Sequence, residues 1–160
     1  MNIYLIRHGD AENSSSEIKD SERKLTAKGK EKMGKAVAGW KNIITHFDYV
    51  ISSPFLRALQ TAKIIAKAYE IDEHKLIIDK RLKSGSTTED VIEISNAFEA
   101  EDIAFVGHQP EFAEHVSKLV SDSGAYFEFK KGAIAKIVFF NKVKEGKGSL
   151  EFLIPPNIFK

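Results

Sequence analysis

Four short apolar runs alternate with longer amphipathic patterns through the first 120 residues of the chain. Each run suits a buried strand, and the apolar positions between the runs recur at steps of three and four, which indicates helices. Strands that alternate with helices imply a parallel sheet that is covered by helices on both faces. The predicted strands are Asn2–Arg7, Tyr49–Ser52, Leu76–Asp79 and Ile103–Val106.

The predicted helices begin at capping signals. A small polar side chain can accept a hydrogen bond from the unpaired backbone N–H groups at a helix start, and proline suits the first helical position. We expect one helix capped by Thr26 and ending near Ile44, one starting at Ser53 and Pro54 and ending near Tyr69, one with the capping pair Thr87 and Asp90 and ending near Phe98, and one opened by Pro110.

The C-terminal part of the chain is rich in strand patterns. Tyr126–Phe129, Ile134–Phe140 and Leu150–Ile154 are predicted strands, and Glu145-Gly146-Lys147-Gly148 turns between the last two. We expect them to add antiparallel edge strands to a mostly parallel sheet. The chain shows no internal repeat and no linker, so residues 1–160 are predicted to form a single α/β domain with three layers.

Composition excludes several classes of protein. With no cysteine, the chain cannot form disulfides, thiolate nucleophiles or cysteine-based zinc and iron–sulfur sites. The net charge of +1 argues against a general nucleic-acid binder. No apolar run approaches the length that spans a membrane. We therefore expect a cytoplasmic monomer without nucleic-acid or membrane contacts.

Basic side chains follow three of the predicted strands. In open α/β sheets, ligands bind beyond the carboxyl ends of the strands. Arg7 and His8 end the first strand, Arg57 follows the second, and His108 follows the fourth. Helix starts at the same edge add backbone N–H groups and partial positive charge. The pattern predicts a site for a compact anion such as phosphate.

Each of these residues has an ordinary alternative role as a structural histidine or a surface arginine, and it is their convergence that favours a site. A metal site made of His8, His108 and Asp10 lacks typical ligand spacing, and the arginines would repel a cation. The remaining histidines lack this convergence and are predicted to be surface residues: His46, His74 and His115.

The motifs LIRHGDAE, LTAKGKEKM, VISSPFLRALQTA and VGHQP resemble, in order and spacing, the histidine phosphatase superfamily and its SixA-type phosphohistidine phosphatases. The resemblance implies a phosphoglycerate-mutase-like fold, a nucleophilic His8, and no metal or cofactor. It also implies that Arg7, Arg57 and His108 bind the phosphoryl oxygens. Three further contacts are candidates: the Gly9 carbonyl with the His8 ring, the Ser14 side chain with phosphate, and the Gln109 N–H with phosphate.

The chain departs from many relatives in one respect, because they place a glutamate shortly after the third strand as the general acid. Here Lys80 and Arg81 occupy that place, and Asp79, Asp10 and Glu12 are the fallback carboxyl groups. The imidazole of a phosphohistidine leaves phosphorus without strong acid assistance, so the expected substrate is a phosphohistidine-bearing protein such as a phosphotransfer domain. The alternatives are a small-molecule phosphomonoesterase and a non-catalytic phosphate-binding module.

Overall fold

The computed structural model describes residues 1–159 and contains one six-stranded sheet. Its strands are β1 (Asn2–Arg7), β2 (Tyr49–Ser52), β3 (Leu76–Ile78), β4 (Asp102–Gly107), β5 (Ile134–Val138) and β6 (Ser149–Ile154). Their order is β3-β2-β4-β1-β5-β6. The first four neighbours are parallel, and β5 and β6 are antiparallel, which confirms the predicted α/β class and the antiparallel C-terminal edge.

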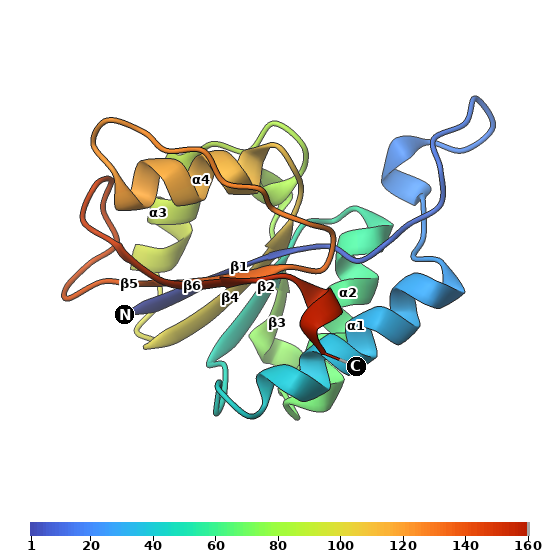
Figure 1. Ribbon diagram of the computed structural model, residues 1–160, viewed down its shortest axis with the longest axis horizontal. Coiled ribbons are helices and arrows are strands. Elements are labelled where there is room, and N and C mark those ends of the chain that lie inside the picture. Colours follow the sequence, from blue (N-terminus) through green and yellow to red (C-terminus); the bar gives the residue numbers. More distant parts are fainter. Residues whose placement is uncertain (160) are drawn as a thin grey trace.

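Two pairs of helices cover the two faces of the sheet (Figure 1). The pair α1 (Ala27–Trp40) and α2 (Leu56–Ala68) lies on one face, and α3 (Thr88–Asn96) and α4 (Glu111–Val120) lie on the other. Because side chains along a strand alternate between faces, Ile3 and Leu5 of β1 pack toward α4, whereas Tyr4 and Ile6 pack toward α1. The result is a three-layer molecule with a core on each side of the sheet.

Two of the predicted helix caps are present in the structure, and two other predicted helix limits differ from it. Thr26 Oγ1 accepts from the Gly29 backbone N–H over 2.9 Å, as predicted, and Thr87 and Asp90 form the predicted capping box. The α1 helix ends at Trp40 and not near Ile44, and α2 begins at Leu56 and not at Pro54. Ser53 is not the N-cap of α2, which is Phe55, but its hydroxyl oxygen accepts from the Phe55 backbone N–H over 3.3 Å. The same hydroxyl is hydrogen-bonded to a second side chain, described below.

The predicted strand Tyr126–Phe129 is wrong. This segment belongs to no strand of the sheet. Phe129 is buried against the α4 side of the sheet, while Tyr126 is fully exposed. Alternating apolar residues therefore pack here without joining a ladder. Among residues 1–159, no helix has the length and apolar character needed to cross a bilayer.

The carboxyl ends of the parallel strands lie level with one another. Arg7 pairs with Gly107, and Ser52 pairs with Val106, in the register of the sheet. The backbone continues this alignment past the strands, since the His8 N–H donates to the Gly107 carbonyl and the Ser53 N–H donates to the Val106 carbonyl. The loops after β1, β2 and β4 thus start at the same edge, which is where the site lies.

Candidate active site

His8 has a defined tautomer. Its Nδ1 lies 2.7 Å from the carbonyl oxygen of Gly9, and because a carbonyl only accepts, Nδ1 carries the proton. The other ring nitrogen, Nε2, accepts a hydrogen bond from Arg57 Nε over 3.1 Å. The lone pair of His8 is therefore on Nε2, on the side of the ring that faces Arg57. The predicted contact between the His8 ring and the Gly9 carbonyl is present.

Gly9 occupies a tightly packed position. A Cβ at this residue would lie 2.6 Å from Cγ of Met33 in α1, closer than real contacts allow. Its backbone N–H donates to Thr61 Oγ1 over 3.1 Å, and Thr61 in turn donates to the Arg57 carbonyl. The glycine lets the chain after β1 lie against α1 and α2, which holds its carbonyl within hydrogen-bonding distance of His8 Nδ1.

Arg57 is held by a carboxylate from a distant loop. Its NH1 donates to the Asp20 backbone oxygen over 2.6 Å, and its NH2 donates to Asp20 Oδ2 over 3.1 Å. Asp20 lies in the short 3-10 helix η1 (Asp20–Glu22), where it also pairs with Arg23. A guanidinium has five N–H donors, so Arg57, with three engaged, retains two for a ligand.

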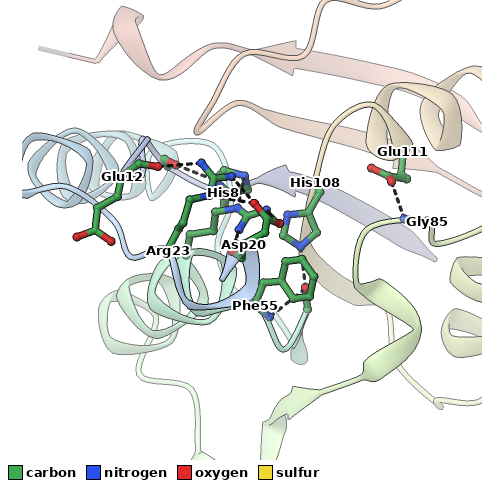
Figure 2. A network of polar contacts seen from close by, with 11 residues as sticks. His8, Glu12, Asp20, Arg23, Phe55, Gly85, His108 and Glu111 are labelled. Carbon is green, nitrogen blue, oxygen red and sulfur yellow. Dashed lines mark hydrogen bonds and ion pairs between the residues drawn. The ribbon is translucent and has the colours of Figure 1, made fainter. Parts of the chain in front are cut away.

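His108 lies beside His8, with ring centroids 5.3 Å apart (Figure 2). Its Nε2 shares a hydrogen bond of 2.7 Å with the Ser53 hydroxyl. Its Nδ1 is buried and has no hydrogen-bond partner among the residues that the structure describes. The ring packs against Phe55, which also lies beneath the Arg57 guanidinium.

Arg7 completes the group at the sheet edge. Its NH1 donates to the Phe129 carbonyl over 2.7 Å, which ties the segment before β5 to the end of β1. Its Nε is buried without a hydrogen-bond partner in residues 1–159. Buried polar atoms are costly to leave unpaired, so Arg7 Nε and His108 Nδ1 both indicate that a polar ligand completes this site.

Burial and positive charge keep both histidines neutral. Burial is the largest cause that lowers the pKa of His8 to about 3, and His108, Arg57 and Arg7 lower this pKa as well, against the opposing effect of the Gly9 carbonyl. Burial, followed by Arg57, lowers the pKa of His108 to about 4. At neutral pH the site therefore combines two charged arginines with two uncharged imidazoles, which suits an anion.

The family model of the histidine phosphatase superfamily (branch 1) matches residues 3–116, well over half of the chain. The chain belongs to the histidine phosphatase superfamily. A further relative, an uncharacterized protein from Picosynechococcus sp., is 30% identical over 137 residues, which are 84% of this chain and 82% of that protein. Membership of this superfamily supports phosphatase activity.

Solved structures match the fold over nearly the whole chain. The structure of the protein histidine phosphatase SixA complexed with tungstate is similar at a TM-score of 0.85 and 22% identity, covering 100% of both chains. A putative alpha-ribazole-5′-P phosphatase from Escherichia coli is similar at a TM-score of 0.70 and 17% identity, covering 98% of this chain and 97% of the other. These likenesses confirm the phosphoglycerate-mutase-like fold.

The three fallback carboxyl groups of this histidine phosphatase are all engaged elsewhere. Asp79 accepts hydrogen bonds from the Arg81 guanidinium, and Asp10 accepts one from Lys131 Nζ over 2.7 Å; these basic partners lower the pKa of both carboxyl groups. The Glu12 carboxylate accepts from the Lys24 backbone N–H and points away from His8 in Figure 2. Each of the three carboxylates is thus held by a neighbouring hydrogen-bond donor.

Ser14 and Gln109 are the two remaining candidates for contacts with phosphate. Ser14 is exposed in the loop between β1 and η1, and no hydrogen bond of its side chain joins it to the described residues. The Gln109 side chain accepts from the Ala113 backbone N–H over 2.9 Å, within the first turn of α4. Gln109 thus stabilises the start of the helix that follows His108, and its own N–H stays a candidate ligand for phosphate.

Asp20 and Glu111 are polar residues of the site region that the sequence did not single out. Glu111 Oε1 accepts from the Gly85 N–H over 2.6 Å, which holds the β3–α3 loop to the start of α4. Its Oε2 is buried without a hydrogen-bond partner among the described residues. In the view of Figure 2, His108 lies between His8 and Glu111. A polar residue three positions after the VGH segment was the available signal for Glu111.

The prediction that His115 lies on the surface is wrong, because its side chain is buried. Its Nδ1 is 3.0 Å from Thr88 Oγ1, and its Nε2 is 3.0 Å from Ser86 Oγ. The ring therefore joins α4 to the start of α3, and burial lowers its pKa to about 4. His46 and His74 are exposed, as predicted.

Proposed function

We propose that this protein is a metal-independent phosphatase that removes phosphate from protein phosphohistidine through a phosphorylated His8 intermediate. The observation that carries the proposal is the state of His8. Its Nδ1–H is bound to the Gly9 carbonyl, and its Nε2 lone pair faces Arg57. The site also holds two buried nitrogens without a hydrogen-bond partner in residues 1–159. A neutral imidazole with one bare nitrogen is the form that attacks phosphorus.

In the first step, the Nε2 lone pair of His8 bonds to phosphorus as the bond from phosphorus to the substrate nitrogen breaks. As Nε2 bonds to phosphorus, the Arg57 Nε–H group exchanges its hydrogen bond with Nε2 for one with a phosphoryl oxygen. Arg7 binds a remaining oxygen through Nε, and His108 binds another through Nδ1–H, which requires its Nε2 to accept from the Ser53 hydroxyl. Neither Arg7 Nε nor His108 Nδ1 has a hydrogen-bond partner among residues 1–159. Phosphoryl transfer spreads charge over these oxygens, so prearranged donors supply most of the catalysis.

In the second step, a water oxygen bonds to phosphorus and the bond to Nε2 breaks. The electron pair returns to Nε2, the proton of the water goes to solvent, and inorganic phosphate is released. His8 is again neutral, which its low pKa favours. Neither step requires a metal ion, because the arginines supply the positive charge.

The state of the carboxyl groups supports a phosphohistidine substrate. An alkyl phosphate releases a strongly basic alkoxide and needs a proton from the enzyme. A phosphohistidine releases an imidazole, whose conjugate acid has a pKa of about 6.5, so solvent can supply the proton. Asp79, Asp10 and Asp20 are each paired with a basic side chain, and all three have lowered pKa values.

The chain between β3 and β4 also supports a protein substrate. It contains a three-residue 3-10 helix, η3 (Lys80–Leu82), and the nine-residue α3. Since α3 packs against the sheet through Val91 and Ile94, little of this segment can fold over the site as a lid. An open site can accept a histidine presented on the surface of another protein.

Glu111 favours one rival function, a small-molecule phosphomonoesterase. Its Oε2 is buried without a partner among the residues described, and a proton on this oxygen would make Glu111 an acid for an alkoxide leaving group. The other alternative, a non-catalytic phosphate-binding module, has less support. The residues that catalysis would need are all present and close together: His8, Arg7, Arg57 and His108.

The deciding experiment compares kcat/KM on a phosphohistidine protein or peptide with kcat/KM on sugar and glycerol phosphates. The proposal expects the phosphohistidine substrate to be turned over faster by at least about tenfold, with no loss of activity in chelator. A monoester turned over equally well would favour the rival function. Absence of any turnover, with phosphate still bound, would leave the binding module.

A further inference from the structure

His46, Asp48 and Asp102 form a cluster at the opposite end of the sheet from His8. His46 and Asp48 lie in the loop before β2, and Asp102 begins β4, where it pairs with Asn2 at the start of β1. One side-chain atom from each of the three lies within 4.8 Å of the others. The phosphatase site uses none of these residues.

Each aspartate is held by one of its two oxygens. Asp102 Oδ1 accepts from Asn2 Nδ2 over 2.9 Å and from the Tyr4 hydroxyl over 2.8 Å. Asp48 Oδ2 accepts from the backbone N–H groups of Glu101 and Asp102. These contacts fix both carboxylates and leave Asp48 Oδ1 and Asp102 Oδ2 facing the same nitrogen, Nε2 of His46.

The separations suit a shared cation better than direct hydrogen bonds. His46 Nε2 is 3.6 Å from Asp48 Oδ1 and 3.8 Å from Asp102 Oδ2, both too long for a good hydrogen bond. Two ligands that each lie about 2.1 Å from a metal ion are about 3.4–4.2 Å apart at tetrahedral to linear angles. Both separations fall in this range.

We propose that His46, Asp48 and Asp102 bind a divalent first-row transition metal ion, with zinc as the probe that fits the donor set. One neutral imidazole and two carboxylates match a divalent charge and leave a position for water. Fixed carboxylates reduce the ordering that binding requires, and contacts from outside the ligand set typically raise metal affinity. The ion would join the loop before β2 to the start of β4.

The donor set also predicts selectivity. Imidazole nitrogen suits zinc, nickel and copper, whereas magnesium prefers oxygen ligands in a near-ideal octahedral arrangement. We therefore expect zinc to bind and magnesium at the same concentration to bind much more weakly. The exposed edge of the imidazole gives the ion a path from solvent, because the His46 side chain is 59% exposed.

The test is isothermal titration with zinc chloride, combined with thermal unfolding of the full chain. The proposal expects one zinc per chain and a rise in Tm of about 5–10 °C at a hundredfold excess over Kd. His46→Ala should weaken zinc binding at least about tenfold. His74→Ala is the matched control, since it removes an exposed histidine outside the cluster, and it should leave zinc binding unchanged.

Asp48→Asn provides a second variant that preserves the fold. The asparagine oxygen can still accept from the Glu101 and Asp102 N–H groups, but its NH2 group then replaces the ligand oxygen beside His46. Zinc binding should fall, while turnover of a phosphorylated substrate without added metal should match the parent protein. Zinc binding that is absent from the parent, or equal in all the variants, would overturn the proposal and leave a histidine–aspartate ion pair.

Discussion

Arg57 donates from Nε to Nε2 of His8 over 3.1 Å, and this contact assigns the His8 lone pair to the nitrogen that faces the anion site. The donor also belongs to a side chain that Asp20 holds by two further hydrogen bonds. One arginine thus orients the proposed nucleophile in the free protein and remains beside it to bind a phosphoryl oxygen.

His8→Ala should lower kcat on a phosphohistidine peptide by at least about a thousandfold, because removal of a nucleophile leaves only binding contributions. Phosphate release measures the loss, and the circular dichroism spectrum should remain that of the parent protein. His74→Ala, an exposed change, is the control and should retain full activity. A folded His8→Ala protein with more than a few per cent of the parent rate would rule out His8 as the nucleophile.

Arg57→Ala should lower kcat by about a hundredfold to a thousandfold, the usual effect of losing one transition-state donor. Arg57→Lys should retain more activity than Arg57→Ala, because lysine keeps the positive charge. It should remain less active than the parent protein, because lysine cannot contact both His8 and Asp20 as the planar guanidinium does. Steady-state rates of the two variants, side by side, measure the difference. Equal rates in the two variants would contradict this expectation, because they would mean that a positive charge at this position contributes nothing by itself.

Asp20→Asn should separate phosphate binding from turnover. The Asp20 carboxylate is hydrogen-bonded to the Arg57 guanidinium, and its negative charge repels a bound anion. Removing this charge should lower the inhibition constant for phosphate by about fivefold, the effect of a unit charge at several ångströms. The asparagine oxygen accepts more weakly from Arg57, and kcat should therefore fall. Glu17→Gln removes an exposed charge of the same loop and should change neither quantity. An unchanged inhibition constant in Asp20→Asn would contradict this role.

The free energy of unfolding should decrease as the pH falls from about 6.5 toward 4. His8, His108 and His115 have folded-state pKa values lowered to about 3, 4 and 4, so the unfolded chain binds protons in this window that the folded protein does not. Each lowers stability by up to about 1.4 kcal/mol per pH unit, and the loss is absent above the unfolded pKa.

Urea unfolding at several pH values measures this slope. His115→Gln should reduce it, because one of the three buried imidazoles is removed, whereas the exposed change His74→Gln should leave it as in the parent. A free energy of unfolding that stays constant from pH 6.5 to 5 would show that the buried histidines do not control acid stability.

The sequence predicts the parts of the site that follow directly from strands. Arg7, His8 and His108 are fixed by the ends of β1 and β4, and a parallel sheet brings such ends together whatever the details of packing. Arg57 follows from the same rule because it lies in the first turn after β2. Apolar runs and their order thus carry enough information for the sheet and for these four side chains.

The missed features depend on contacts that local patterns do not encode. Asp20 lies in a polar loop without periodicity, and only the folded chain brings it to Arg57, 37 positions away. His115 had a usable signal, because it lies between Phe112 and Leu119 on the buried face of α4. The Tyr126–Phe129 alternation misled because burial of Phe129 needs no partner strand.

Glu111→Gln distinguishes the two candidate substrates. Glutamine preserves the hydrogen bond from the Gly85 N–H to the side-chain oxygen but cannot give up a proton. If the protein acts on phosphohistidine, whose imidazole leaves without an enzymic acid, kcat/KM on a phosphohistidine peptide should change by less than about threefold. If Glu111 is an acid for alkoxide leaving groups, kcat/KM on a sugar phosphate should fall by about a hundredfold or more, the usual contribution of general acid catalysis.

The same variant tested on two phenyl phosphates gives an internal control for the leaving group. A nitrophenolate needs little protonation, whereas an unsubstituted phenolate, with a pKa near that of tyrosine at about 10, needs more. An enzyme that uses Glu111 as its acid should lose rate on phenyl phosphate and keep it on nitrophenyl phosphate. We expect equal and small effects on both, because the buried Glu111 oxygen lies beyond His108 from the nucleophile in Figure 2. A selective loss on phenyl phosphate would assign Glu111 as the acid and favour a small-molecule substrate.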